Sequence, residues 1–237
     1  MPSFSAVACE IALASPRVPG TFPREVIAAL DFDRPRRPFA GADLEHYFSA
    51  EPKVASQERE VRFSVLGREY RCTTDTGVFG KAGLDEGTRL LIEHAAAWPG
   101  ARVLDLGAGW GPVGVVIGQR YEAEVWAVES NARAAALCER NLERWGVHHR
   151  VVLGDGLEPI TGERFDLILL NPPIRAGKKV YYPWLEGSRQ HLRPGGSLWV
   201  VVRTNQGARS LREELTRHFA KVEDMAFDRG YRVYRAS

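Results

Sequence analysis

Apolar residues from about residue 100 onward follow two alternating patterns. Short, nearly continuous apolar runs such as Phe165–Leu170 predict buried strands, and the stretches between them have the apolar spacing of helices. Strands that alternate with helices predict a mostly parallel sheet covered on both faces. The predicted strands are Arg102–Leu106, Glu124–Val128, Arg150–Leu153, Phe165–Leu170 and Ser197–Val202, and the predicted helices are Gly111–Tyr121, Ala132–Trp145, Pro183–Leu192 and Ala208–Phe219.

Strand pairs of another kind flank this pattern at both ends. Upstream, Val61–Val65 and Tyr70–Cys72 alternate apolar and polar residues around Gly67, which predicts a β-hairpin. Near the C-terminus, Val222–Phe227 and Tyr231–Tyr234 are too close in sequence for a helical crossover, so they should pair antiparallel. We therefore expect an α/β fold: a Rossmann-like, doubly wound, mostly parallel seven-stranded sheet with an antiparallel C-terminal hairpin, preceded by a small β-hairpin region.

The chain is expected to divide into three segments. Residues 1–45 contain several prolines and predict an irregular N-terminal extension with one short helix. Residues 46–84 hold the hairpin and a loop punctuated by glycine, and residues 85–237 hold the main sheet. Asp85 or Thr88 is the expected N-cap of the helix that opens this last segment.

Composition limits the range of functions. With 237 residues, 44% of them hydrophobic, the chain can build one sizeable core, and a net charge of +2 does not by itself indicate a nucleic-acid binder. Its three cysteines and six histidines show no metal-ligand spacing, so we expect no metal and a reducing, cytoplasmic environment. No apolar stretch approaches membrane-spanning length, and we expect no membrane partner.

The first strand of the main sheet ends in a glycine-rich turn, Asp105-Leu106-Gly107-Ala108-Gly109. Gly109, Gly111 and Gly114 fit a dinucleotide fingerprint, whereas Asp105 followed by Gly107 and Gly109 fits an S-adenosylmethionine loop. Asp105 favours the second interpretation, because a carboxylate there would repel a pyrophosphate and attract the ammonium group of a methionine. A structural turn without a ligand is the weakest of the three alternatives.

Acidic residues also end the next two strands. Glu129 is placed to accept hydrogen bonds from two ribose hydroxyls, and Asn131 is the better N-cap of the following helix, which would leave Glu129 free for the ligand. Asp155, beside Gly156, is placed to accept the amine of adenine. The alternatives are a helix N-terminal acid for Glu129 and an ordinary turn residue for Asp155.

A second motif, Asn171-Pro172-Pro173-Ile174, follows the buried run Phe165–Leu170. Prolines have a fixed φ, donate no backbone N–H and force the preceding residue into an extended conformation. The side-chain oxygen of Asn171 and the carbonyl of Pro172 should therefore be held rigidly, without partners from a regular ladder. Two fixed acceptors suit a planar exocyclic amine, and the alternative is a turn that merely ends the strand.

The residues around this motif bear on the choice of acceptor. Ile174 stands where an aromatic side chain would stack on a base, and this weaker platform favours guanine N2 over adenine. Arg175, Lys178 and Lys179 follow at once and are candidate phosphate contacts of an RNA, although a basic run is more often a solvated loop.

Together these motifs resemble the "methyltransferase small" family of class I S-adenosylmethionine-dependent methyltransferases, in particular single-domain forms of the bacterial 16S rRNA guanine-N2 methyltransferases. The resemblance covers about residue 46 to the C-terminus. Gly80 departs from an expected serine and Glu86 from an aromatic residue, and the duplicated N-terminal half of the longer relatives is missing. The resemblance implies cofactor contacts at Phe79, Lys81, Asp105, Gly107, Ala108, Gly109, Glu129, Ser130, Asp155, Gly156 and Asn171, and target-base contacts at Asn171, Pro172, Pro173 and Ile174.

The expected function is methyl transfer from S-adenosylmethionine to an exocyclic amine, guanine N2 in ribosomal RNA. An adenine N6, a protein glutamine or a small molecule remain alternative acceptors, and a non-catalytic RNA-binding module is an alternative from another class. The expected partner is ribosomal RNA or a ribosomal particle, and the protein is expected to be a monomer or homodimer. Asp105 and the lack of a hydride-transfer site disfavour a dehydrogenase.

Overall fold

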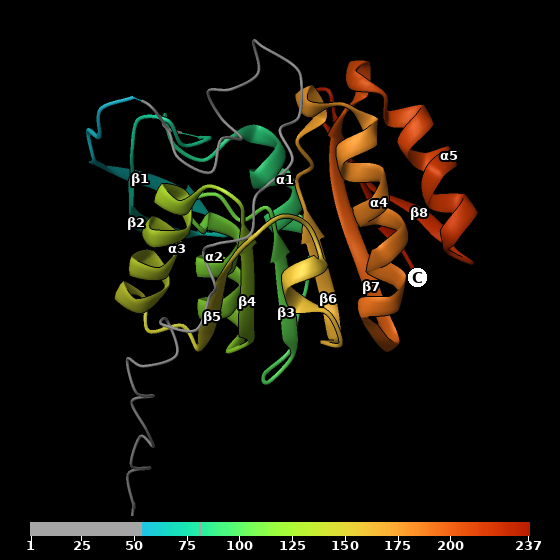
Figure 1. The fold of residues 1–237 in the computed structure, drawn as a ribbon, viewed down its shortest axis with the longest axis horizontal. Coiled ribbons are helices and arrows are strands. Elements are labelled where there is room, and N and C mark those ends of the chain that lie inside the picture. Colours follow the sequence, from blue (N-terminus) through green and yellow to red (C-terminus); the bar gives the residue numbers. More distant parts are fainter. Residues whose placement is uncertain (1–53, 81) are drawn as a thin grey trace, which may run out of the picture. The chain divides into compact units, whose positions relative to one another are not determined.

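A computed structural model describes residues 54–80 and 82–237, all of which belong to the unit Gly41–Ser237. The expected division at residues 45 and 84 stays a prediction, and the segment 1–45 lies outside the described residues. The described residues form a seven-stranded sheet and a separate two-stranded sheet (Figure 1). The strands are β1 (Arg59–Val65), β2 (Arg68–Thr74), β3 (Arg102–Leu106), β4 (Glu124–Glu129), β5 (His149–Leu153), β6 (Phe165–Leu170), β7 (Leu192–Arg203), β8 (Val222–Asp228) and β9 (Tyr231–Ala236), and the α-helices are α1 (Glu86–His94), α2 (Pro112–Tyr121), α3 (Ala132–Arg144), α4 (Lys178–Ser188) and α5 (Ala208–His218).

The large sheet has the strand order β5-β4-β3-β6-β7-β9-β8. The strands β5, β4, β3, β6 and β7 run parallel, and β9 is antiparallel to both β7 and β8. This topology confirms the expected doubly wound sheet with an antiparallel C-terminal hairpin. The chain moves outward from β3 to β4 and β5, then returns to place β6 on the other side of β3. Ligands bind at such a switch point, beyond the carboxyl ends of the strands.

Side chains alternate across the sheet and pack into two apolar clusters, one on each face. On β3, Val103 belongs to the cluster that α1, α2 and α3 cover, whereas Leu104 belongs to the cluster under α4 and α5. All three apolar residues of β3 are at most 1% exposed, as a parallel strand covered on both faces requires. The same alternation explains why these strands appear in the sequence as continuous apolar runs.

The small hairpin of β1 and β2 is attached to this core through α3. Asn141, which is 1% exposed, accepts a hydrogen bond from the Thr73 amide and donates to the Thr73 carbonyl, both at 2.8 Å. Its side-chain nitrogen also donates to the Trp110 carbonyl at 2.8 Å. A single buried amide in α3 thus connects the hairpin to the glycine-rich turn after β3.

The predicted boundaries of two elements are wrong by up to five residues. The helix expected at Pro183–Leu192 is α4, which begins at Lys178 and ends at Ser188, so Pro183 lies inside the helix and not in its first turn. Gly177, with φ of 90°, is the N-cap residue of this helix. The strand expected at Ser197–Val202 is longer, since β7 starts at Leu192 and pairs with β6 on both sides of a register shift.

The described part of the chain contains no helix that is long and apolar enough to cross a membrane.

Gly118 in α2 provides a test of how closely the helices pack on the sheet. A Cβ atom there would lie 2.3 Å from Cγ1 of Val147 and 3.0 Å from Cγ2 of Val125. Gly118→Ala should lower the free energy of unfolding by about 1–3 kcal/mol, because overpacking outweighs the ~1 kcal/mol gain in helix propensity. Urea denaturation measures the change.

The double variant Gly118→Ala/Val147→Ala supplies the control. If the clash is the cause, the two substitutions will be strongly non-additive, and the second will recover part of the stability that the first removes. Simple additivity would show that α2 relaxes away from Val147 without cost.

Candidate functional site

Three strand ends define the site. Leu106 pairs in register with Val128 of β4 and with Leu170 of β6. The residues that follow these positions are Gly107, Glu129 and Asn171, and they therefore lie along one edge of the sheet, at the switch point. The register alone brings the two motifs of the sequence together.

The glycine-rich turn has one side that faces open space and one that faces the core. Gly107 and Gly109 have φ values of 77° and 58°, and a Cβ atom at either would meet no heavy atom of the described residues within 4 Å. Gly111, with φ of 85°, differs because its Cβ atom would lie 2.7 Å from Sγ of Cys138. The first two glycines therefore leave room for a ligand to approach the backbone, and the third allows α2 to pack against α3.

Glu129 holds this turn in place through hydrogen bonds to backbone amides. Its Oε2 accepts the Gly109 amide at 2.8 Å and its Oε1 accepts the Asn131 amide, also at 2.8 Å. Asn131 is the N-cap of α3, as expected, with Oδ1 accepting from the Arg133 and Ala134 amides at 3.0 and 3.1 Å. Glu129 is therefore free of the capping role, as expected, although each of its oxygens already has a backbone partner. Each oxygen keeps a second lone pair for a hydroxyl donor.

Burial raises the pKa of Glu129, and hydrogen bonds from the amides of Asn131 and Gly109 and from Ser130 oppose that rise. The hydrogen bonds from Ser130 thus help to stabilise the ionised form of Glu129. A carboxylate that is buried yet hydrogen-bonded in this way is a rigid acceptor.

Asp105 lies deeper, at 4% exposure, between the glycine-rich turn and the start of α2. Its Oδ2 accepts the Gly114 amide at 3.2 Å, and no lysine or arginine among the described residues forms an ion pair with it. Burial raises its pKa to about 7; the Gly114 hydrogen bond lowers it and the nearby charge of Glu129 raises it further. In the folded protein this carboxyl group therefore keeps its proton up to a pH of about 7, whereas in the unfolded chain it ionises near its ordinary value of 3.8. As pH rises between these two values, the group lowers the free energy of unfolding. A bound cation would offset that loss of stability.

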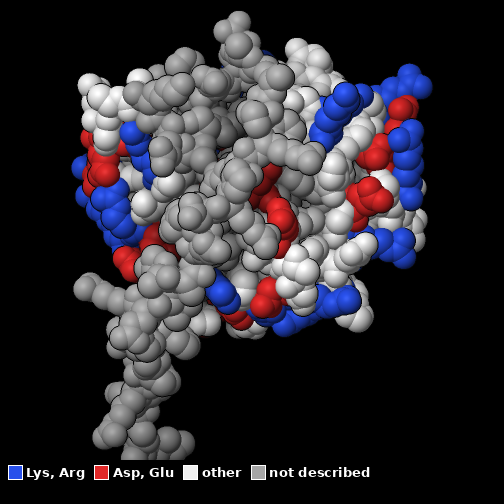
Figure 2. Space-filling view, viewed as in Figure 1, with Lys and Arg blue, Asp and Glu red and all other residues white. Residues whose placement is uncertain are grey.

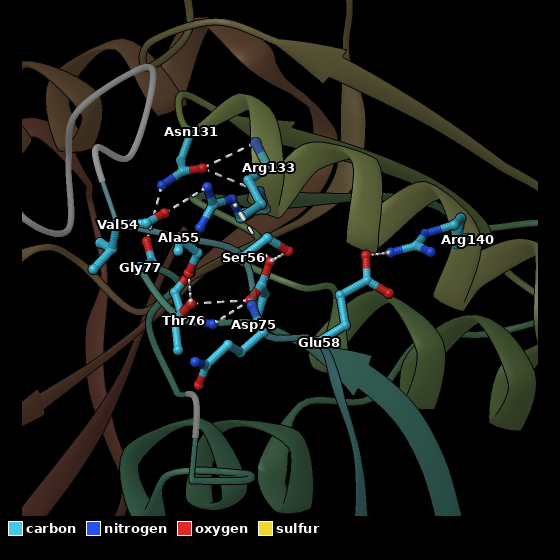
Figure 3. A network of polar contacts seen from close by, with 12 residues as sticks. Val54, Ala55, Ser56, Glu58, Asp75, Thr76, Gly77, Asn131, Arg133 and Arg140 are labelled. Carbon is cyan, nitrogen blue, oxygen red and sulfur yellow. Dashed lines mark hydrogen bonds and ion pairs between the residues drawn. The ribbon is translucent and has the colours of Figure 1, made fainter.

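The loop between β2 and α1 is joined to α3 by a network around Asp75 (Figure 3). Asp75, 1% exposed, accepts hydrogen bonds from the Ser56 hydroxyl at 2.6 Å and from the Gln57 and Thr76 amides at 2.5 and 2.6 Å. Arg133 of α3 pairs with Asp75 at 3.6 Å and donates to the Thr76 carbonyl at 2.8 Å. Burial favours a raised pKa for Asp75, but the hydrogen bonds outweigh burial and lower it. This carboxylate is ionised and holds the start of the loop.

The same loop is fixed next to the end of β4. Asn131 donates through Nδ2 to the Gly77 carbonyl at 3.2 Å, only two residues after Glu129. Val78 is buried, and Phe79 beside it is 55% exposed. An exposed aromatic ring at this position is available to cover a ligand, whereas Lys81, the other candidate from this loop, lies outside the described residues.

The departure at Gly80 has a steric explanation. A Cβ atom on Gly80 would lie 2.9 Å from Nε1 of Trp110, which is itself 2% exposed. The indole occupies the volume that a serine side chain would need, and the φ of 74° also favours glycine.

Asp155 and Gly156 form the far end of the site, after β5. Asp155 is exposed, and desolvation followed by the charge of Glu158 raises its pKa. Gly156 has a φ of 59°, and a Cβ atom there would lie 2.4 Å from Nε1 of Trp184 in α4. Trp184 was not predicted from the sequence, because no spacing links residue 184 to residue 156.

Asn171 has a defined orientation at the end of β6. Its Nδ2 donates to Oγ1 of Thr88 at 2.9 Å and to Oδ1 of Asp85 at 3.4 Å. Asp85 is the N-cap of α1, accepting from the Gly87 and Thr88 amides, and the Thr88 hydroxyl donates to its Oδ2. Because the amide nitrogen is engaged, Oδ1 of Asn171 is left to accept from a ligand. The sequence suggested Asp85 and Thr88 only as cap candidates and missed their contact with Asn171.

The two prolines shape the rest of the turn after β6 (Asn171–Ile174). Pro172 is buried, and its carbonyl accepts the Ile174 amide at 2.8 Å. It has no ladder partner, as expected, but it is not fully free, and one lone pair remains for a ligand. Pro173 is the half-buried residue before a short 3-10 helix, Ile174–Ala176. Ile174 packs partly against the apolar cluster beneath α4.

The basic residues that follow are exposed. Arg175, Lys178 and Lys179 form no ion pair with any residue that the structure describes, and Nζ of Lys178 lies 5.6 Å from the ring centroid of Tyr182. Lys178 and Lys179 also occupy the first turn of α4, where the helix dipole disfavours positive charge. Helix stability therefore does not explain these lysines. On the described part of the surface that Figure 2 shows, lysine and arginine side chains lie among aspartate and glutamate side chains.

The methyltransferase small domain family matches residues 69–235. The chain is 35% identical over 198 residues to an uncharacterised protein, YbxB, of Bacillus subtilis, covering 81% of this chain and 98% of that protein. It is 36% identical to ribosomal RNA small subunit methyltransferase C of Pseudomonas entomophila, covering 68% of this chain but 49% of the relative. The chain thus spans about half the length of that ribosomal RNA relative.

Among solved structures, the chain is similar to the T. thermophilus 16S rRNA N2 G1207 methyltransferase (RsmC) in complex with AdoMet and guanosine. The TM-score is 0.70 and the identity 27%, covering 78% of this chain and 52% of the other. The fold expectation is confirmed, and so is S-adenosylmethionine as the cofactor. The chain belongs to the methyltransferase small domain family.

Proposed function

We propose that this protein transfers a methyl group from S-adenosylmethionine to the N2 amine of a guanine in small-subunit ribosomal RNA. The observation that carries the proposal is the orientation of Asn171, whose amide nitrogen is held by Thr88 so that Oδ1 can accept an N–H from the acceptor. The same edge of the sheet carries the open glycine-rich turn of the cofactor site.

The described residues fit the cofactor. Open space over Gly107 and Gly109 admits a ligand close to the backbone, and Ala108 lies between them. Asp105 is a buried carboxylate with no cationic partner in the part of the chain that the structure describes, which suits it to the ammonium group of a methionine. Glu129 keeps lone pairs for the ribose hydroxyls. When bound, S-adenosylmethionine supplies an electrophilic methyl group on its sulfonium.

Other cofactor contacts follow from the edges of this turn. Ser130 is next to Glu129, and Asp155 and Gly156 form the proposed adenine wall with Trp184 behind Gly156. The exposed ring of Phe79 would cover the bound cofactor. Lys81 remains a candidate from sequence alone.

Asn171 and Pro172 would perform the acceptor chemistry. An exocyclic amine on a purine is a weak nucleophile, because its lone pair is delocalised into the ring. Oδ1 of Asn171 and the remaining lone pair of the Pro172 carbonyl would each accept one N–H and stabilise the amine as it pyramidalises. Pro173 fixes the turn, and no strong base is needed, since the alkylated amine is acidic enough to lose a proton to water.

Two features support guanine in RNA over the other acceptors. Ile174 offers an apolar but not an aromatic face, which favours guanine N2 over adenine N6. Arg175, Lys178 and Lys179 are exposed and unpaired within the described chain, as phosphate contacts would be. Protein glutamine and small molecules would not need these cations. Because the ribosomal RNA relatives are about twice as long, the modified nucleotide is not transferred from them.

Mass spectrometry tests the chemistry directly. Ribosomal RNA from cells that lack the gene should accept methyl groups from S-adenosylmethionine and the purified protein, and the product should be N2-methylguanosine. Asn171→Ala should reduce this rate by a factor of about 100 or more, because it removes one fixed acceptor. Cofactor affinity, measured by calorimetry, should stay within a factor of about 3.

A different methylated nucleoside would correct the acceptor and keep the enzyme class. An equal loss of activity and of cofactor affinity in Asn171→Ala would assign the residue a structural role.

Cofactor affinity should depend on pH through Asp105. The pKa of about 7 means that the carboxyl group is mostly neutral at pH 6 and mostly ionised at pH 8. Since the ammonium group requires the ionised form, the dissociation constant should rise roughly tenfold as pH falls from 8 to 6. Asp105→Asn should weaken binding and flatten this profile, and an unchanged slope would place the titration elsewhere.

Lys178 and Lys179 should contribute to the salt dependence of RNA binding. Replacing both with glutamine should reduce the slope of log K against log salt by about 1.4 to 1.8, as expected for two lost phosphate contacts. Lys221→Gln is the control for the loss of one surface charge, because Lys221 already pairs with Glu223 at 2.7 Å. An equal effect per replaced lysine in the two variants would indicate only a general loss of charge.

A further inference from the structure

A chain of three polar side chains connects the turn after β6, which holds the proposed target-base contacts Asn171–Ile174, with the first turn of α1. Asn171 donates to Thr88 at 2.9 Å, and the Thr88 hydroxyl donates in turn to Asp85. Thr88 is 5% exposed, so this contact is shielded from water. Asp85 also accepts the Gly87 and Thr88 amides at 3.1 Å each, and the Asn171 amide more weakly at 3.4 Å.

The direction of this chain is fixed by the chemistry of its last member. An ionised carboxylate can only accept hydrogen bonds, and Asp85 accepts the hydroxyl hydrogen of Thr88. The Thr88 oxygen then has lone pairs but no hydrogen for Asn171, so it can only accept from the amide nitrogen. A rotated Asn171 would bring its oxygen against two acceptors, which is strongly unfavourable. The carboxylate thereby dictates which end of the Asn171 amide faces the site.

The first turn of α1 is itself held in place. A Cβ atom on Gly87 would lie 2.9 Å from the ring of Tyr231 in β9 and 3.2 Å from Oδ1 of Asp85, so only glycine permits this approach. An ion pair between Glu86 and Arg229 joins the same turn to the hairpin of β8 and β9. The support behind Asn171 is therefore attached to the β8–β9 hairpin at two neighbouring positions.

From this geometry we infer that Thr88 and Asp85 are positioning residues for the reaction: they orient the Asn171 amide so that its oxygen faces the acceptor amine. The inference rests on the proposed function and extends it to two residues outside the proposed substrate and cofactor contacts. Helix capping alone would need Asp85 but not the Thr88 hydroxyl, and it would not depend on the direction of the hydrogen bonds.

The test separates orientation from folding. Thr88→Val keeps the shape and helix propensity of the side chain and removes only the hydroxyl, so kcat should fall about 10- to 100-fold. The affinity for S-adenosylmethionine and its pH profile should be unchanged. Thr88→Ser restores the hydroxyl and should recover most of kcat. Thr74→Val is the matched control, since the Thr74 hydroxyl is equally buried and has no partner among the described residues.

Asp85→Asn tests the direction of the hydrogen bonds. Asparagine caps helices as well as aspartate does, so the melting temperature should change by only a few degrees. An amide at position 85 can donate, however, which frees Thr88 to donate to a rotated Asn171. The expected result is a fall in kcat similar to that of Thr88→Val, without a change in cofactor affinity.

Several results would overturn the inference. A kcat of Thr88→Val equal to that of the wild type, or a loss that Thr88→Ser does not recover, would remove the positioning role. A parallel loss of melting temperature and cofactor affinity would show that these residues serve only the fold. A wild-type protein that methylates no base in ribosomal RNA would instead contradict the proposed function, before any variant is compared.

Discussion

The register between β3, β4 and β6 is the constraint on which the site depends. Parallel strands end at one edge, and the pairing of Leu106 with both Val128 and Leu170 aligns the three ends to the residue. A shift of one residue in β6 would turn Asn171 to the other face of the sheet. The buried apolar runs of these strands prevent such a shift, because either face would lose its packing. Core packing thus sets the position of the polar groups that would contact the methyl donor and acceptor.

Burial of acidic groups is the electrostatic cost of this arrangement. Asp105 and Glu129 both have raised pKa values, and burial is the largest cause for each. They differ in how the protein compensates. Glu129 accepts at least two backbone amides, whereas Asp105 accepts one and has no cation partner within the described residues. The more poorly compensated carboxylate is the one placed to gain most from a cationic ligand.

The sequence predicted the fold well because its signals are local or periodic. Apolar runs, helical spacing and the short link between β8 and β9 indicate a mostly parallel sheet with an antiparallel C-terminal hairpin, without knowledge of long-range contacts. Boundaries failed where two local signals compete, as at Gly177 and Pro183, since either residue can precede or open a helix. The N-caps Asp85 and Asn131 were recognisable because an N-cap is a contact within a few residues of sequence.

Site residues were predictable where a motif carries them, and not where the contact is long-range. Gly107 and Asn171 belong to motifs. The hydrogen bond from Asn171 to Thr88, however, joins residues 83 positions apart, and no periodicity in the sequence predicts it. The contact of Trp184 with Gly156 is similar, and here the glycine is the only signal. These unpredicted contacts share one property: each joins an element outside the motifs to a residue that was expected to touch a ligand. Motifs therefore identify the groups that act, whereas the packing of α1 and α4 determines which way those groups face.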